Sequence, residues 1–196
     1  MLPAVRRGIL GGTFDPPHLA HLVAGEAAHR QLDLDAVTFV PAGAPWQKSD
    51  RSVTEATHRW AMTELAVAGV DYFEADDREV HREGWTYTVD TLESYPAGDD
   101  LIVVLGADAA RGIRTWHRSD EVLSRAEIAV VPRPGVALED VTRSLEGARW
   151  RILDSLELGI SGTQLRARVA AGRSIRFLVR DPVWWYVDEH GLYVEG

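Results

Sequence analysis

The sequence predicts an α/β protein built on a doubly wound parallel sheet with helices on both faces. Short apolar runs of strand type alternate along the chain with segments of helical periodicity, which is the pattern of βαβ units. The run 101–105 is continuously apolar, as expected for a central parallel strand buried on both faces. Right-handed crossovers between such strands would produce the doubly wound arrangement.

Length and composition are typical of one soluble globular domain. The chain has 196 residues, of which 45% are hydrophobic and 26% charged, so it can bury a substantial core. We expect a single domain over 1–196 with a small helical subregion at about 160–196. No apolar run approaches the roughly 20 residues that span a bilayer, and no secretory pattern opens the chain. A cytoplasmic location is therefore expected, and the absence of cysteine agrees with it.

The charge balance narrows the class of partner. A net charge of −9 argues against a general nucleic-acid binder, which needs a basic face. Small phosphorylated substrates remain possible because local donors and dipoles can hold anions on an acidic protein. Lys48 is the single lysine beside 20 arginines. A lysine is a compact charge that arginine does not replace at a phosphate, although chance retention is the alternative.

The first segment of interest joins a predicted strand, 5–10, to a predicted helix, 18–32. It reads Gly11-Gly12-Thr13-Phe14-Asp15-Pro16-Pro17-His18-Leu19-Ala20-His21. A strand that passes through glycines into a helix start can offer main-chain amides and the helix dipole to phosphate. His18 and His21 share a helix face, which suggests charge stabilisation on that phosphate. An ordinary turn, or half of a zinc site, remains as the alternative.

This segment resembles the signature of the nucleotidylyltransferase superfamily, in the form found in nicotinate mononucleotide adenylyltransferases. That signature reads Gly-Gly-Thr-Phe-Asp-Pro-x-His-x-Gly-His, and Ala20 replaces its last glycine. The resemblance implies a Rossmann-like fold and an ATP site. By resemblance, the ATP-binding residues here are Gly11, Gly12, Thr13, Phe14, His18 and His21, with both histidines catalytic.

A strand at 36–40 is expected next, followed by a loop over 41–48 with two prolines and a glycine. The family carries Pro-x-x-x-Pro-x-His-Lys here, and its lysine reaches the nucleotide phosphates. By resemblance, Lys48 is a catalytic and substrate-binding residue, whereas Gln47 departs from the family histidine.

The capping-box spacing of Ser52 and Glu55 predicts a helix through about 68, on which surface or cap roles are expected for His58 and Arg59. A third strand is predicted at 70–73. The charged run 76–79 is expected to be a solvated segment.

The segment 84–92 reads as a turn whose Thr88 caps a short helix at 89–95. It also resembles the family segment Ser/Thr-Tyr-Thr-x-x-Thr-Leu, which helps to recognise the nicotinate ring. By resemblance, Thr86 and Thr88 bind substrate; simple capping does not exclude this role.

Asp108 follows the apolar strand 101–105 and Gly106, where ligands of open α/β sheets bind. It is placed to accept ribose hydroxyls, with a plain helix cap as the alternative. The family has Gly-x-Asp followed eight residues later by tryptophan, and Asp108 and Trp116 keep that interval. By resemblance, Gly106 and Asp108 contact ATP, Asp108 also contacts the acceptor, and Trp116 stacks on its pyridine ring. The family's Arg-Pro-Gly likewise implies that Arg133 lies near substrate phosphate, unless it is a surface residue.

The remaining elements complete the alternation. Helices are predicted at 121–124 and 138–145 and strands at 129–131 and 150–153. The tail resembles the family's ending, with Trp184 and Trp185 expected to pack a terminal helix onto the domain.

The second strong signal is Ile160-Ser161-Gly162-Thr163-Gln164-Leu165-Arg166. A Ser/Gly/Thr helix start offers hydroxyls and free amides to an anion, although it could be an ordinary N-cap. The family motif Ile-Ser-Ser/Thr-Thr-x-Ile/Val-Arg binds the β- and γ-phosphates of ATP. Gly162 departs from that motif and removes one hydroxyl. By resemblance, the ATP contacts here are Ile160, Ser161, Thr163 and the catalytic Arg166.

The resemblance implies adenylyl transfer from MgATP to nicotinate mononucleotide. Mg²⁺ would be held mainly by ATP phosphates and water, with no dedicated protein ligands. We expect the two signatures, although about 150 residues apart, to converge on one polyphosphate. The alternatives are a related transferase with nicotinamide mononucleotide or phosphopantetheine as acceptor, a non-catalytic nucleotide sensor, and a zinc hydrolase built on His18 and His21. A homo-oligomer is possible.

Overall fold

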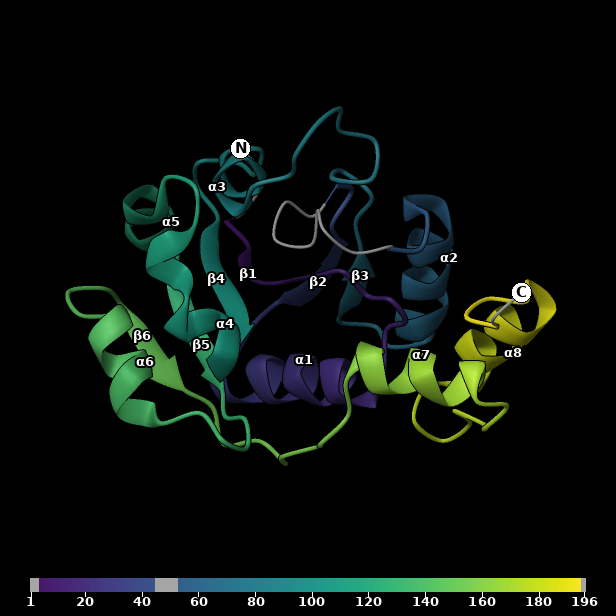
Figure 1. Cartoon of the computed structure of the whole chain (residues 1–196). Helices are drawn as coiled ribbons and strands as arrows, with labels where there is room; N and C mark the ends of the chain where they lie inside the picture. The colour runs from purple at the N-terminus through teal and green to yellow at the C-terminus, as the bar shows by residue number, and fades with distance from the viewer. Residues whose placement is uncertain (1–3, 45–52, 195–196) are drawn as a thin grey trace.

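A computed structural model describes residues 4–44 and 53–194 and contains a six-stranded parallel sheet (Figure 1). Its strand order is β3-β2-β1-β4-β5-β6, and every neighbouring pair is parallel. The strands are β1 (Arg6–Gly12), β2 (Ala36–Pro41), β3 (Phe73–Ala75), β4 (Asp100–Gly106), β5 (Glu127–Val131) and β6 (Trp150–Ile152). The predicted doubly wound α/β fold is thereby confirmed.

Successive side chains of the central strands point to opposite faces of the sheet and contribute to two apolar cores, one on each face. Ile9 and Val103, which are paired across β1 and β4, belong to one core, and Leu10 and Val104 belong to the other. The first core receives α3 (Thr88–Glu93), α4 (Ala107–Arg111), the 3₁₀ helix η2 (Ile113–Thr115), α5 (Ser119–Arg125) and α6 (Leu138–Ser144). The second receives α1 (Leu19–Leu32) and the end of α2 (Ala56–Val67).

The last two helices lie beside the sheet rather than over it. In Figure 1, α7 (Gly162–Ala170) and α8 (Asp181–Glu189) sit next to α2, although more than 90 residues separate them from it in the sequence. A third apolar cluster joins the three helices through Met62, Leu165 and Val183. The C-terminal part of the chain is therefore anchored to α2, close to the end of β1.

Three local predictions differ from the structure. The third strand begins at Phe73 rather than 70, because Gly69 adopts a positive φ of 78° and residues 70–72 form a turn. Thr88 is the first helical residue of α3, and Tyr87 occupies the N-cap, so the capping prediction for Thr88 is wrong. Trp184 packs against the third cluster as expected, whereas Trp185 is 57% exposed on α8.

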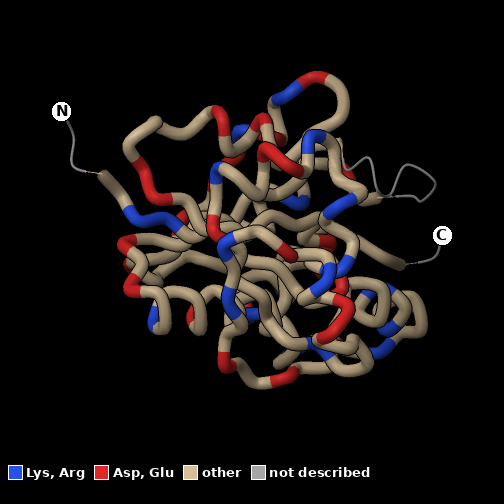
Figure 2. Tube along the Cα trace, turned by 90° about the vertical axis from the view of Figure 1, so that its left-hand side faces the viewer, with Lys and Arg blue, Asp and Glu red and all other residues tan. Residues whose placement is uncertain are grey.

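The surface mixes both signs of charge. Along the trace in Figure 2, Lys and Arg positions are interspersed with Asp and Glu positions on the side in view. Over residues 4–44 and 53–194, no helix is long and apolar enough to cross a membrane.

Arg59 of α2 contradicts the prediction of a surface or cap role, since it is only 1% exposed. Its Nε donates to the Thr54 carbonyl at 2.8 Å, and its Nη2 donates to the Gly43 carbonyl at 2.8 Å. Its Nη1 donates to the carbonyls of Thr13 (2.9 Å) and Ala42 (2.5 Å). Burial lowers the pKa of Arg59 from its usual value. One guanidinium thus joins the loops that follow β1 and β2 to the start of α2.

Replacing Arg59 with leucine should lower the free energy of unfolding by about 3 kcal/mol or more, because several buried carbonyls lose their donor. The matched control is Arg30→Leu on α1, whose exposed side chain pairs with Glu26. That change should leave the free energy of unfolding close to that of wild type, because an exposed ion pair contributes little to stability. Urea unfolding of both variants measures the difference, and equal losses would contradict the tying role of Arg59.

Candidate active site

A cavity with a volume of about 380 Å³ lies at the carboxyl ends of the central strands. Strands β1 and β4 lie side by side at its centre, where the strand order reverses direction. Open α/β sheets bind ligands at such a switch point. Among the residues predicted to form the site, the cavity is lined by Gly11, Gly12, Thr13, His21, Thr86, Thr88, Gly106, Asp108, Trp116 and Arg133.

Phe14 packs behind two residues of the cavity lining, Gly12 and His21. Its backbone has a positive φ of 50°, and its ring is buried in the core. A Cβ added at Gly12 would lie 3.0 Å from this ring, so the glycine allows the close packing. The ring also meets His21 edge-on, with centroids 5.0 Å apart. Phe14 therefore orients His21, and its side chain does not line the cavity.

The two histidines form a stacked pair with ring centroids 3.7 Å apart. The His18 main-chain N–H donates to Nδ1 of His21 at 3.1 Å, so the proton of a neutral His21 lies on Nε2. His18 is 3% exposed, and its Nδ1 has no hydrogen-bond partner among the described residues. Burial, and then the positive charge of Arg133, lower the pKa of His18 to about 4. His18 is thus a neutral group at pH 7.

The amides at the start of α1 are engaged within the protein. The Leu19 N–H donates to the Leu178 carbonyl at 3.0 Å, and the His21 N–H donates to the His18 carbonyl at 2.9 Å. Together with the His18 N–H, three of the amides expected to cradle phosphate already have partners. At α7, in contrast, the first amides, Gly162 and Thr163, have no intrahelical acceptor because they open the helix.

The two signature segments meet, as predicted. Nη1 of Arg166 donates to the Asp15 carbonyl at 2.6 Å and lies 3.6 Å from the Asp15 carboxylate. The Tyr193 hydroxyl donates to the other oxygen of that carboxylate at 2.7 Å. A Cβ at Gly162 would lie 2.8 Å from the Asp15 carbonyl, so the departure from the family motif allows this close approach.

The remaining residues of the second signature shape the start of α7. Ser161 is its N-cap, and its hydroxyl accepts from the Gln164 amide at 3.3 Å. The Thr163 hydroxyl accepts from Nη2 of Arg166 at 3.4 Å. Ile160 packs against the third apolar cluster. Ile160, Ser161, Thr163 and Arg166 do not line the cavity. They belong to the segment that meets the turn at Asp15.

An ion pair lies over the end of β4. Nε of Arg133 is 3.3 Å from Oδ1 of Asp108, which stands in the first turn of α4. A Cβ at Gly106 would lie 2.7 Å from that carboxylate and 2.8 Å from the guanidinium. A larger residue at this position would therefore displace the ion pair. Both side chains are partly exposed, so they can reorganise around a ligand.

The opposite end of the cavity is aromatic and hydroxylic. Trp116 packs against the first core, and the adjacent His117 lies over the Tyr87 ring, with centroids 4.3 Å apart. Thr86 is buried, and its amide donates to the Ala44 carbonyl at 3.3 Å. The arrangement offers a flat apolar surface beside hydrogen-bonding groups, which suits a heteroaromatic ring.

Sequence reasoning missed several lining residues, namely Glu79, Tyr87, Thr91, His117, Leu156 and Leu158. Adjacency to Trp116 was the available signal for His117. Glu79 carried no local signal, because it belongs to the charged run predicted to be solvated and is nevertheless only 8% exposed.

Lys48 and Gln47 lie outside the residues that the structure describes. Within the described ranges, no group of three or more His, Asp or Glu side chains is arranged to hold a metal ion. The stacked pair of His18 and His21 therefore has no third protein ligand there for the zinc site that was weighed as an alternative.

Comparison with known proteins agrees with this geometry. Residues 9–168 match the cytidylyltransferase-like family. A protein of Thermoanaerobacter sp. is 40% identical over 199 residues, covering 96% of this chain and 94% of the relative. One of Corynebacterium kroppenstedtii is 42% identical over 193 residues, covering 96% and 91%. Both are named "Probable nicotinate-nucleotide adenylyltransferase".

A solved structure shares the fold. It is Plasmodium falciparum nicotinic acid mononucleotide adenylyltransferase complexed with NaAD, with a TM-score of 0.79 at 18% identity, covering 96% of this chain and 97% of that one. The sequence relatives and the family match together identify the chain: it belongs to the cytidylyltransferase-like family and, within it, to the nicotinate-nucleotide adenylyltransferases, which are nucleotidyltransferase enzymes.

Proposed function

We propose that this protein transfers the adenylyl group of MgATP to nicotinate mononucleotide, giving nicotinate adenine dinucleotide and pyrophosphate. The observation that carries the proposal is the contact between the two signature segments, the Arg166–Asp15 hydrogen bond, beside a cavity with an aromatic far end. The relatives' names supply the acceptor. Residues 1–196 would act as one domain, with the C-terminal helices completing the nucleotide site.

The chemistry is an in-line displacement at the α-phosphorus of ATP. An oxygen of the acceptor phosphate forms the new P–O bond, and the bond from the α-phosphorus to the bridging oxygen breaks, so pyrophosphate leaves with the electron pair. The acceptor phosphate is already ionised at neutral pH, so no strong base is required. The protein then acts by positioning the reactants and stabilising charge.

The polyphosphate would lie between α1 and α7. Nε2–H of His21 can donate to a phosphate oxygen, since Nδ1 is occupied by the His18 amide. Arg166, the α7 amides and the hydroxyls of Ser161 and Thr163 would hold the β- and γ-phosphates. In the ligand-free protein His18 is neutral and stacks on His21, and both rings would stabilise the charge that develops on the phosphates. Lys48 remains a proposed phosphate contact.

The acceptor would occupy the aromatic end. Trp116 would stack on the pyridine ring, with Thr86 and Thr88 as polar contacts beside it. Asp108 would accept ribose hydroxyls, and Arg133 would contact phosphate after leaving its pair with Asp108. Mg²⁺ enters as part of the substrate MgATP, bound by phosphate oxygens and water, which suits its reluctance to dehydrate.

The direct test is pyrophosphate release from MgATP with three acceptors in parallel: nicotinate mononucleotide, nicotinamide mononucleotide and phosphopantetheine. The highest kcat/KM is expected with nicotinate mononucleotide. Higher kcat/KM with another acceptor would reassign the substrate. ATP binding without pyrophosphate release in the presence of any of the three acceptors would favour a non-catalytic nucleotide sensor.

The low pKa of His18 makes stability depend on pH. The unfolded state takes up a proton near pH 6.5, but the folded state does so only near pH 4, so wild type loses stability as pH falls through that window. The loss attributable to this group is about 3 kcal/mol. It should be absent in His18→Gln, and the control His81→Gln should keep the wild-type slope. Urea unfolding between pH 4.5 and 7.5 measures it; parallel curves for wild type and His18→Gln would reject the assignment.

Removing the Trp116 ring should weaken binding of the acceptor and leave binding of ATP nearly unchanged. In Trp116→Ala the KM for nicotinate mononucleotide should rise by about 10-fold or more, with the KM for ATP changing about 2-fold or less, because a stacked ring contributes on the order of 1–3 kcal/mol. The exposed Trp185 supplies the control, since Trp185→Ala should leave both constants unchanged. A larger rise for ATP than for the acceptor would show that Trp116 serves the other substrate.

A further inference from the structure

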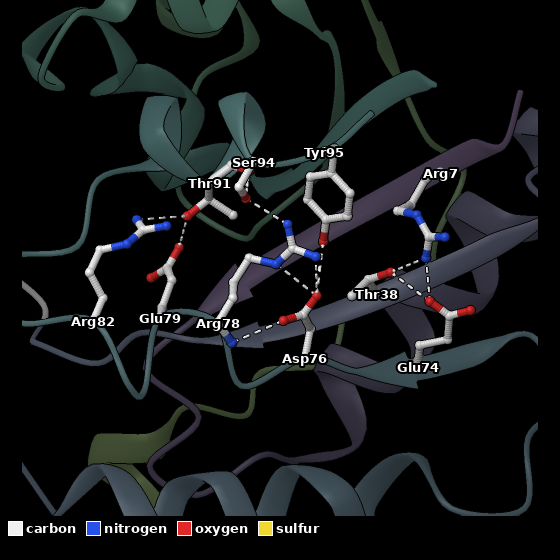
Figure 3. Close-up of polar contacts among 10 residues, drawn as sticks. All are labelled: Arg7, Thr38, Glu74, Asp76, Arg78, Glu79, Arg82, Thr91, Ser94 and Tyr95. Atoms are coloured by element: carbon white, nitrogen blue, oxygen red, sulfur yellow. Dashed lines mark hydrogen bonds and ion pairs between the residues drawn. The ribbon is translucent and has the colours of Figure 1, made fainter. Parts of the chain in front are cut away.

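Glu79 is a buried carboxylate in the wall of the cavity for which the proposed mechanism has no use. Its immediate neighbours in the charged run turn elsewhere: Arg78 pairs with Asp76 and lies over the Tyr95 ring (Figure 3). Glu79 points instead toward Thr91 of α3, as the same view shows. It lines the cavity together with Thr86 and Thr88.

The carboxylate is held by the Thr91 hydroxyl, which donates to Oε1 of Glu79 at 2.5 Å. The Thr86 hydroxyl donates to the Ala44 carbonyl at 3.5 Å. Nη1 of Arg82 reaches the Thr91 oxygen at 3.5 Å. Burial raises the pKa of Glu79, whereas the hydrogen bond from Thr91 and the charge of Arg82 oppose that rise. Thr91 is itself buried, and Glu79 is the nearest of its side-chain hydrogen-bond partners, ahead of the Tyr87 carbonyl at 3.4 Å.

The main chain of Glu79 is also fixed. A Cβ at Gly43 would lie 2.0 Å from the Glu79 carbonyl oxygen, so the loop after β2 packs directly against it. The same loop is held from the other side by Arg59, which donates to the Gly43 carbonyl. Glu79 therefore stands on a fixed main chain, and its side chain connects that support to Thr91 of α3.

We propose that Glu79 is a positioning residue for the acceptor end of the cavity. It sets α3 and the turn 86–88 that leads into it through its hydrogen bond to Thr91, whose hydroxyl also contacts the Tyr87 carbonyl. This inference rests on the proposed function, in which that turn contacts the pyridine ring. A buried network of this kind loses its geometry when one member is removed, because the remaining polar groups seek new partners. Loss of Glu79 should thus weaken acceptor binding while the distant polyphosphate site stays intact.

Glu74 provides a matched control in the same region. It is an acid on β3, five residues before Glu79, and it pairs with Arg7 and Thr38 (Figure 3). It does not line the cavity. Glu74→Gln therefore changes a charge near Glu79 without touching the turn 86–88.

The experiment compares wild type with Glu79→Ala, Glu79→Gln, Thr91→Val and Glu74→Gln. For each protein, the KM of both substrates and the calorimetric Kd of nicotinate mononucleotide are measured. Glu79→Ala should raise the acceptor KM and Kd by about 10-fold, with the KM for ATP changing about 2-fold or less. Glu79→Gln should recover most of the loss, because its amide oxygen still accepts from Thr91. Thr91→Val should act in the same direction. The acceptor KM of the double variant Glu79→Ala/Thr91→Val should rise by less than the product of the two single fold-changes.

The proposal would be overturned if Glu79→Ala and Thr91→Val both kept the wild-type KM and Kd for nicotinate mononucleotide. It would also be overturned if the KM for ATP rose as much as the KM for nicotinate mononucleotide. If Glu79→Ala does not fold, the near-isosteric Thr91→Val decides alone. A wild type that binds nicotinate mononucleotide without releasing pyrophosphate would contradict the proposed function, and the Kd series would still test Glu79.

Discussion

The contact between Arg166 and Asp15 is the interaction on which the site depends. It joins the start of α7 to the turn after β1, two segments that the chain order places 151 residues apart. The Asp15 carboxylate is buried, and Tyr193 holds its second oxygen, so the end of the chain closes on the same point. Burial and the Asp15 charge raise the pKa of Tyr193, which keeps it a hydrogen-bond donor. Because α7 and α8 lie beside the sheet, this contact and their packing on α2 bring them next to the turn after β1.

Buried polar groups hold the loops of the site in a similar way. Arg59 fixes the loops after β1 and β2, and Glu79 accepts a hydrogen bond from Thr91 of α3. His18 stacks on His21 and presents a neutral ring. A protein that works by aligning two phosphorylated reactants needs this kind of preorganisation more than it needs a strong acid or base. The interior polar contacts and the proposed chemistry are thus consistent with one another.

Sequence patterns predicted the features that depend on local order. The apolar runs, the glycine turn and the Ser-Gly-Thr helix start led to the parallel sheet and to a meeting of 11–21 with 160–166, because parallel strands bring their carboxyl ends to one edge. The place of Trp116 in the cavity lining was expected from the resemblance to the family, in which a tryptophan follows Gly-x-Asp after eight residues.

Features that depend on tertiary packing escaped prediction. Arg59 and Glu79 were assigned to the surface because charged residues are rarely buried, and only the carbonyls and hydroxyls around them make burial tolerable. The amides of α1 were expected to face phosphate, but Leu178, from a segment remote in sequence, supplies an acceptor for one of them. The exposed position of Trp185 likewise depends on which face of α8 meets α2.

The most direct test of the central claim is a crystal structure of the protein with a non-hydrolysable ATP analogue and nicotinate mononucleotide. The β- and γ-phosphates should lie between His21 and the start of α7, within hydrogen-bond distance of Arg166, and the pyridine ring should lie against Trp116. Phosphates bound away from the 160–166 segment, with Arg166 still on Asp15, would contradict the claim that the two signatures form one site.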